Sequence, residues 1–305
     1  MGTFFKALEQ AERERALKDQ AKRQYTPEVG ASSDPEGPGA QPIVAPALVF
    51  QRPVAREALP KSRAARETSD QPFGRVEEHL VSLLSPASFS AEQYRALRLR
   101  VEQLHKTTNL SIVGVTSPQA GDGKTLTTIN LAGSLAQAPE ARVLIVDADL
   151  RRSSMTACLG LERSRGRGLV GAILDTSVSL KDVVEPCPPF NLSVVRAGRR
   201  PSAPYELLKS PRLGQLLEEA RQQYDYVVLD MPPLVPLPDC GVIGRSVDGF
   251  LIVVAANKTP RKLVEEALKV LDPATVLGLI FNGDDRPLSA YYGYHHDRHS
   301  ALEGD

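Results

Sequence analysis

The chain has 305 residues, and its 37 Lys and Arg residues are balanced by 37 Asp and Glu residues, so the formal net charge is zero. A hydrophobic content of 42% excludes wholesale disorder, and the neutral charge argues against a nucleic-acid partner. No apolar run approaches the ~18 residues of a membrane span, and the N-terminus lacks the apolar stretch of a signal peptide. The cysteines are odd in number and show no metal-ligand spacing. These features together predict a cytoplasmic protein.

The first 88 residues are expected to lie outside the folded domain. Residues 1–25 are charged and helix-prone. From Thr26 to Pro72 the chain is rich in Pro, Gly, Ser and Ala and buries too little apolar surface to offset its chain entropy. We therefore assign residues 26–88 to a disordered linker. The N-terminal helix on this tether is either an element that docks on a partner or a solvated helix that frays.

The folded domain is predicted to begin with an amphipathic helix near Phe89. Ser90 and Gln93 form a capping-box pattern at its start. Apolar residues then recur at three- and four-residue steps and form one stripe: Tyr94, Leu97, Val101 and Leu104. At 100° per residue, a charged group falls on a different side of this helix and is free to contact another molecule: Glu92, Arg95 and Arg98.

Apolar, strand-like runs alternate with helical stretches over about the next 190 residues. The runs are apolar throughout, which indicates strands covered on both faces. This alternation predicts an α/β domain with a doubly wound, mostly parallel sheet over residues 89–283. We therefore predict one α/β domain here, whereas the length of the chain alone suggests two domains. The predicted strands are 110–115, 143–146, 192–195, 226–229, 250–254 and 276–281, and the predicted helices include 124–137, 212–223 and 261–271.

The first of these strands leads through a glycine-rich turn, Ser117–Thr125, directly into a helix. Successive backbone N–H groups in such a turn converge on phosphate oxygens, and a helix-dipole charge of about +0.5 adds to the attraction. Lys124 is expected to reach the β- and γ-phosphates of a nucleotide, and the Thr125 hydroxyl to hold Mg²⁺. Pro118 stands where this P-loop pattern usually has its first glycine. The predicted nucleotide-binding residues are Ala120, Gly121, Asp122, Gly123, Lys124, Thr125 and Leu126.

Two later strands end in acidic residues. Asp147 and Asp149 follow the run 143–146, and Asp230 follows the run 226–229. Ligands bind at this carboxyl edge in open α/β sheets, so we expect the three acids to point toward the phosphate loop. One carboxylate there can hold Mg²⁺, and a second can orient or deprotonate an attacking hydroxyl. Each acid alone is also compatible with a helix cap, but the set beside the P-loop favours a phosphoryl-transfer site.

The ordered motifs resemble those of the bacterial tyrosine autokinases, a branch of the MinD/ParA-like P-loop ATPases. The resemblance covers about Ser90 to Asn282 and includes Asp-Ala-Asp-Leu-Arg-Arg after one strand and Leu-Asp-Met-Pro-Pro after another. MinD/ParA-type ATPases carry a signature lysine early in the P-loop, and that position is Gln119 here. This difference favours the kinase branch over the alternative, a nucleotide-switched ATPase or scaffold without kinase activity.

The resemblance implies an ATP- and Mg²⁺-dependent protein-tyrosine kinase. Lys124 is then a catalytic residue, and the metal contacts come from Thr125, Asp147 and Asp230. Asp147 is the candidate general base, although spacing alone does not separate it from Asp149. The spacing of Glu92, Arg95 and Arg98 resembles the family motif that joins neighbouring subunits into a ring, so a homo-oligomer is expected.

The resemblance also implies the acceptor and the partner. Residues 284–305 form a polar tail in which Tyr291, Tyr292 and Tyr294 cluster, and the family phosphorylates such a cluster between subunits. A tail that docks its aromatic rings on the surface is the alternative. The process served is control of exopolysaccharide or capsule synthesis and export. A separate transmembrane co-polymerase or activator is then expected to recruit the chain to the inner face of the membrane.

Charge is distributed unevenly. The region 81–283 has 23 basic and 20 acidic residues, a net charge of +3, whereas residues 284–305 have 2 basic and 5 acidic residues, a net charge of −3. A basic core and an acidic tyrosine tail favour docking of a tail on a core. One dense basic run is a candidate for the phosphate edge or for a phosphotyrosine, with a solvated loop as the alternative: Arg151, Arg152, Arg163, Arg165 and Arg167.

Overall fold

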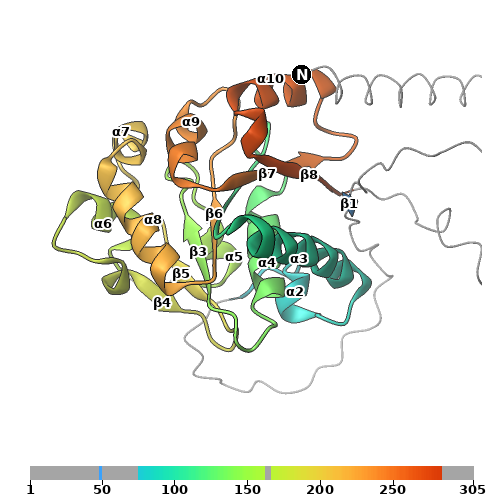
Figure 1. Ribbon diagram of the computed structural model, residues 1–305, viewed down its shortest axis with the longest axis horizontal. Coiled ribbons are helices and arrows are strands. Elements are labelled where there is room, and N and C mark those ends of the chain that lie inside the picture. Colours follow the sequence, from blue (N-terminus) through green and yellow to red (C-terminus); the bar gives the residue numbers. More distant parts are fainter. Residues whose placement is uncertain (1–47, 50–74, 162–165, 284–305) are drawn as a thin grey trace, which may run out of the picture. The chain divides into compact units, whose positions relative to one another are not determined.

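The computed structural model describes residues 48–49, 75–161 and 166–283 (Figure 1). These residues form one eight-stranded sheet in the order β1-β8-β7-β2-β6-β3-β5-β4. Neighbouring strands run parallel except for β4 and β5, which pair in antiparallel fashion. The strands are β1 (Leu48–Val49), β2 (Ile112–Thr116), β3 (Val143–Asp147), β4 (Val184–Pro186), β5 (Ser193–Val195), β6 (Tyr226–Asp230), β7 (Gly249–Ala255) and β8 (Val276–Asn282). The predicted doubly wound α/β fold is confirmed.

Helices cover both faces of the sheet (Figure 1). Successive residues of one strand enter different cores: Ile112 belongs to one buried cluster and Val113 to the other. This is the arrangement that continuous apolar strands indicate. One face carries α2 (Val81–Leu84), α3 (Phe89–Thr108), α4 (Lys124–Leu135) and α5 (Met155–Cys158). The other carries α6 (Gly168–Leu174), α7 (Pro204–Leu208), α8 (Pro211–Gln223), α9 (Asp239–Ile243) and α10 (Arg261–Val270).

The beginning of the domain differs from the sequence-based expectation. Residues 75–88, which we assigned to the linker, pack on the domain: Leu80 is fully buried and joins the α3–α4 core. The Ser82 backbone N–H donates to Asn130 Oδ1 on α4 at 2.9 Å. Ser88, not Ser90, caps α3, because its hydroxyl accepts from the Ala91 N–H at 3.2 Å. The segment docks through Leu80, with Val76, Val81 and Leu83 packed on the same core, and through backbone hydrogen bonds. It is short and continues a long polar stretch, so a composition argument does not separate it from the linker.

The strand ends that carry the acids lie side by side. In the register of β3 and β6, Asp147 is paired with Asp230, and Asp230 is in turn opposite Val115 on β2. The P-loop, Ser117–Thr125, begins directly after β2 and ends at the second residue of α4. The sheet therefore brings the two acid-bearing strand ends and the glycine-rich turn to one edge. Within the described residues, no helix is long and apolar enough to cross a membrane.

Candidate nucleotide and phosphoryl-transfer site

The P-loop is held by one residue in the turn after β7 and by the last residue of β8. Asp122 is buried in the loop; its Oδ1 accepts from the Thr259 hydroxyl at 2.7 Å, and its backbone carbonyl accepts from Asn282 Nδ2 at 2.9 Å. Gly123 has φ +95°, and a Cβ there would lie 2.0 Å from Asn282 Nδ2. Only glycine fits this position. The loop is thus fixed in shape before any ligand binds.

Gln119, which stands at the signature-lysine position of the positioning ATPases, turns back on the same loop. Its side-chain amide and its backbone N–H both donate to the Asp122 carboxylate, each at 3.3 Å. Asp122, which we predicted to bind nucleotide, therefore faces inward and has a bracing role. The other six predicted nucleotide-binding residues all line the cleft described below: Ala120, Gly121, Gly123, Lys124, Thr125 and Leu126.

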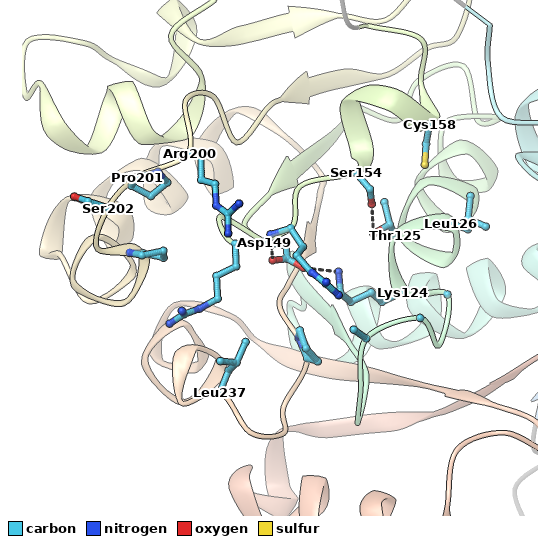
Figure 2. Close-up of a pocket in the computed structure, with 17 residues that line it drawn as sticks. Lys124, Thr125, Leu126, Asp149, Ser154, Cys158, Arg200, Pro201, Ser202 and Leu237 are labelled. Carbon is cyan, nitrogen blue, oxygen red and sulfur yellow. Dashed lines mark hydrogen bonds and ion pairs between the residues drawn. The ribbon is translucent and has the colours of Figure 1, made fainter.

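Lys124 and Thr125, the first two residues of α4, connect the P-loop to the acids. Lys124 Nζ donates to Asp149 Oδ2 at 2.7 Å and lies 3.5 Å from Asp230 Oδ1. The Thr125 hydroxyl donates to Asp230 Oδ2 at 2.6 Å and accepts from the Ser154 hydroxyl at 3.1 Å. Figure 2 shows the first and last of these contacts. The structure therefore brings together the lysine, the hydroxyl and two of the three predicted acids.

Asp147 lies beside this network and is buried completely. Its Oδ2 accepts from the Ser153 hydroxyl at 2.6 Å, but its Oδ1 has no hydrogen-bond partner among the described residues. Burial and the nearby charge of Asp230 raise the pKa of Asp147 to about 7. Burial also raises the pKa of Asp230, although Lys124 and the Thr125 hydroxyl oppose that shift. Burial would lower the pKa of Lys124, but the carboxylates of Asp230 and Asp149 outweigh burial and raise it.

The charge balance of this cluster fits a divalent cation. Three acids with little solvent contact face one lysine, and an unpartnered carboxylate oxygen lies among them. Hydroxyl and carboxylate oxygens are the ligands that Mg²⁺ prefers. A cation bound here would be held by Thr125, Asp230 and Asp147. It would relieve the repulsion from Asp230 that, together with burial, raises the pKa of Asp147.

A cleft of about 770 Å³ opens above the network (Figure 2). The P-loop and α4 form one side of it, and Asp149 lies on its lining, whereas Asp147 and Asp230 lie beneath. Arg200 enters the same cleft from the loop after β5. Two more arginines line it, Arg151 and Arg152. A cleft with a lysine and three arginines is suited to a polyphosphate and to the charge that develops during phosphoryl transfer.

The five arginines of the predicted basic run fall into three groups. Arg151 and Arg152 line the cleft, and Arg151 also makes a two-bond ion pair with the buried Asp239 of α9, at 2.6 and 3.0 Å. Arg167 pairs with Asp175 on the surface. Arg163 and Arg165 lie outside the described residues. Sequence reasoning missed Arg199 and Arg200, which directly follow Gly198 in the loop after β5.

The charged residues on α3 are engaged within the chain. Arg98 donates to the Ser134 carbonyl near the C-terminal end of α4 at 2.8 Å and to Glu102 at 2.6 Å. Arg95 contacts Glu92, the Pro86 carbonyl and Gln137. These bonds fix α3 against α4, so the arginines have a structural role in one subunit in addition to any role between subunits. The predicted acceptors Tyr291, Tyr292 and Tyr294 lie outside the described residues.

Comparison with known proteins agrees with this site. Residues 110–259 match the family model described as "AAA domain". The chain is 32% identical over 223 residues to tyrosine-protein kinase YwqD of Bacillus subtilis, an alignment that covers 72% of this chain and 92% of YwqD. Its fold resembles the solved kinase domain of the Escherichia coli tyrosine kinase ETK, with a TM-score of 0.64, 30% identity, and coverage of 72% and 84% of the two chains. The BceF tyrosine kinase domain is also similar, with a TM-score of 0.59, 33% identity, and coverage of 67% and 81%.

Fold and site thus define a P-loop nucleotide-binding protein with an acid cluster at the carboxyl edge of its sheet. Within that class, the chain belongs to the bacterial tyrosine-protein kinase family. The resemblance inferred from the motifs is confirmed.

Proposed function

We propose that this protein is an ATP-dependent tyrosine autokinase that transfers the γ-phosphoryl group of ATP to tyrosines in its own C-terminal tail. The observation that supports this most is the contact of Lys124 and Thr125 with Asp149 and Asp230 beneath a cleft lined by arginines. Phosphoryl transfer needs positioning and charge stabilisation rather than covalent chemistry from the protein. This site supplies both.

The P-loop and Lys124 hold the phosphates in this proposal. The braced loop presents its backbone N–H groups at the start of α4, where the helix dipole favours negative charge. When bound, Mg²⁺ supplies a positive charge that neutralises the transferring phosphoryl group. Thr125, Asp230 and Asp147 would hold it, in agreement with the unpartnered Asp147 oxygen. Arg151, Arg152 and Arg200 are placed to stabilise the transition-state charge.

The acid that lines the cleft is Asp149, and we assign proton acceptance to it rather than to Asp147, the candidate named from sequence. A general base must reach the hydroxyl before its pKa matters. Asp149 Oδ2 is bonded to Lys124 in this structure and is released when Lys124 bonds to phosphate. We expect Asp149→Asn to lower the rate at saturating Mg²⁺, and Asp147→Asn to raise the Mg²⁺ concentration needed for half-maximal rate. The reverse pattern would return the base to Asp147.

The biological setting of the proposal follows the family. The tail tyrosines Tyr291, Tyr292 and Tyr294 are phosphorylated by a neighbouring copy in a ring assembled through Glu92, Arg95 and Arg98. The kinase works in the cytoplasm and is recruited to the inner face of the membrane by a transmembrane polysaccharide co-polymerase or activator. The process regulated is exopolysaccharide or capsule synthesis and export. The opposite net charges of residues 284–305 (−3) and residues 81–283 (+3) support docking between copies.

The decisive experiment is incubation of the full chain with ATP and Mg²⁺, followed by mass spectrometry of the tail and measurement of ADP release. Phosphate on any of the three tail tyrosines is expected. ADP release without tail phosphate would favour the alternative, a nucleotide-switched ATPase.

Lys124→Met should abolish phosphorylation, with Lys181→Met on the exposed surface as the matched control. Because Lys124 is a buried ion-pair partner, Lys124→Arg serves as a second variant that keeps the charge and so tests function apart from folding. Full activity in both Lys124 variants would place the catalytic site elsewhere.

A further inference from the structure

A second pocket of about 430 Å³ adjoins the nucleotide cleft. It is formed by the segment after β3 and the loop after β5, and it shares four residues with the cleft: Arg151, Arg152, Arg200 and Pro201. We refer to it as the arginine pocket, because four of its nine lining residues are arginines: Arg151, Arg152, Arg199 and Arg200. Arg199 lines this pocket and not the cleft, so the positive charge extends beyond the nucleotide site.

The arginines of this pocket are largely uncompensated. Arg151 is paired with Asp239. Across the part of the chain that the structure describes, the guanidinium groups of Arg152, Arg199 and Arg200 have no carboxylate within ion-pair distance, and all three residues are exposed. Like charges that converge without a counter-charge repel one another, so the pocket favours an anionic ligand.

Apolar residues also line the pocket, and we refer to them as its floor: Leu150 and Ala197, which are buried, and Pro201, which is half-buried. A bare phosphate gains nothing from such a floor, whereas an aromatic ring that carries a phosphate gains from both the floor and the rim. The combination therefore fits an aryl phosphate, which is the side chain of phosphotyrosine, with arginines placed for charge-assisted hydrogen bonds to its oxygens.

The loop that carries Arg199 and Arg200 is rigid. Gly198 has φ +84°, and a Cβ there would lie 2.4 Å from the Arg167 carbonyl oxygen. The flanking carbonyls of Arg196 and Ala197 accept from the first residues of α6, Leu169 N–H at 2.7 Å and Val170 N–H at 3.0 Å. The backbone that precedes Arg199 and Arg200 is thus held in one conformation, which lowers the conformational entropy lost when a ligand binds.

We propose that the arginine pocket binds a phosphotyrosine of the C-terminal tail of another copy while a neighbouring tyrosine of that tail occupies the nucleotide cleft. Tyr292 and Tyr294 are two residues apart, about 7 Å in an extended chain, and the two hollows adjoin through the residues they share. The first phosphorylation of a tail would then strengthen its hold on the kinase for the next. This inference rests on the proposed autokinase function and adds the recognition of its product.

The test is direct binding, which does not depend on catalysis. A fluorescent peptide with the sequence of residues 287–297 is titrated with the full chain carrying Tyr291→Phe, Tyr292→Phe and Tyr294→Phe, which removes self-phosphorylation at these sites. The peptide is used unphosphorylated, phosphorylated at Tyr294, and with phosphoserine in place of Tyr294. We expect the phosphotyrosine peptide to bind at least 10-fold more tightly than either of the others.

Arginine variants assign that preference to the pocket. Arg199, which lines the arginine pocket and not the cleft, is replaced in Arg199→Ala, and the double variant Arg199→Ala/Arg200→Ala removes two charges. Loss of one charge-assisted hydrogen-bonding group should weaken phosphopeptide binding about 10-fold, with a larger loss in the double variant. The charge-matched control is Lys262→Ala/Lys269→Ala on the exposed side of α10, which should leave the preference intact.

Three results would overturn the proposal. The first is equal binding of the phosphotyrosine and unphosphorylated peptides, and the second is a preference that survives both arginine variants. The third is displacement of the phosphopeptide by ATP–Mg²⁺ together with an equal loss of ATP affinity in Arg199→Ala, which would assign the pocket to the nucleotide. None of these depends on whether the chain phosphorylates its tail, so a failure here is distinguishable from a failure of the proposed function.

Discussion

Replacing Asp147 by Asn should stabilise the protein at alkaline pH. Burial and the nearby Asp230 raise the Asp147 pKa from 3.8 to about 7, so the folded state holds this carboxyl group in its protonated form more strongly than the unfolded chain does. The contribution of Asp147 to stability is therefore fully present below about pH 4 and is lost as the pH rises through 7. A difference of roughly three units corresponds to about 4 kcal/mol above pH 7. Asp147→Asn removes that penalty without removing the Ser153 contact, because the Asn amide oxygen can still accept from Ser153.

We expect the Asn variant to raise the free energy of unfolding by about 2–4 kcal/mol at pH 8 and to be nearly neutral at pH 4. The measurement is urea denaturation of the full chain at both pH values, without Mg²⁺. Glu266→Gln, an exposed change on α10, is the control and should change stability by less than about 0.5 kcal/mol.

Mg²⁺ with ADP should stabilise the original protein more than the variant, because the cation replaces the proton. Equal destabilisation by Asp147→Asn at both pH values would refute the reasoning. It would show that burial and the charge of Asp230 do not penalise the ionised Asp147 carboxylate in the folded state.

The remaining predictions concern the P-loop and α3. Gly123→Ala should lower the free energy of unfolding, measured by thermal denaturation, by about 3 kcal/mol or more, because its Cβ would meet Asn282. Gly121→Ala, whose Cβ would meet nothing within 4 Å, should cost only about 1–2 kcal/mol for its positive φ. Equal losses of stability in the two variants would contradict the bracing of the loop. Arg95→Ala with Arg98→Ala should lower the oligomer mass in light scattering, and an unchanged mass in a protein with normal circular dichroism would argue against a ring contact. Ser88→Ala should cost about 1 kcal/mol through loss of the α3 cap, and no change would mean that the cap lies elsewhere.

Much of the fold could be predicted because β2, β3, β6 and β7 have no charged residue before their last position and are therefore buried on both faces. The observed strand and helix bounds agree with the predicted ones to within one or two residues for most of these elements. The short elements β4, α6, α7 and α9 could not be predicted in this way. Each has seven residues or fewer and carries too few turns or alternations for a periodic pattern.

The site was predictable in composition but not in geometry. Strand ends followed by acids placed Asp147, Asp149 and Asp230 at one edge, as observed. Spacing could not show that Asp149 lines the cleft while Asp147 lies beneath it with an unpartnered oxygen, because that difference depends on the path of the chain after β3. Arg199 and Arg200 were missed for a similar reason: only the fold brings their loop beside Arg152.

The hydrogen bond from Asn282 to the P-loop connects the phosphate loop to the strand that precedes the tyrosine-bearing tail. Asn282 is the last residue of β8, and the tyrosine-bearing tail follows it after Gly283. If another copy captures the tail tyrosines, as proposed above, tension along the tail would reach Asn282 through Gly283 and would reach the Asp122 carbonyl through the Asn282 amide. Capture of a subunit's tail by another copy would thus act on the phosphate loop of the same subunit. The role of a chain as substrate would then be coupled to its own role as enzyme.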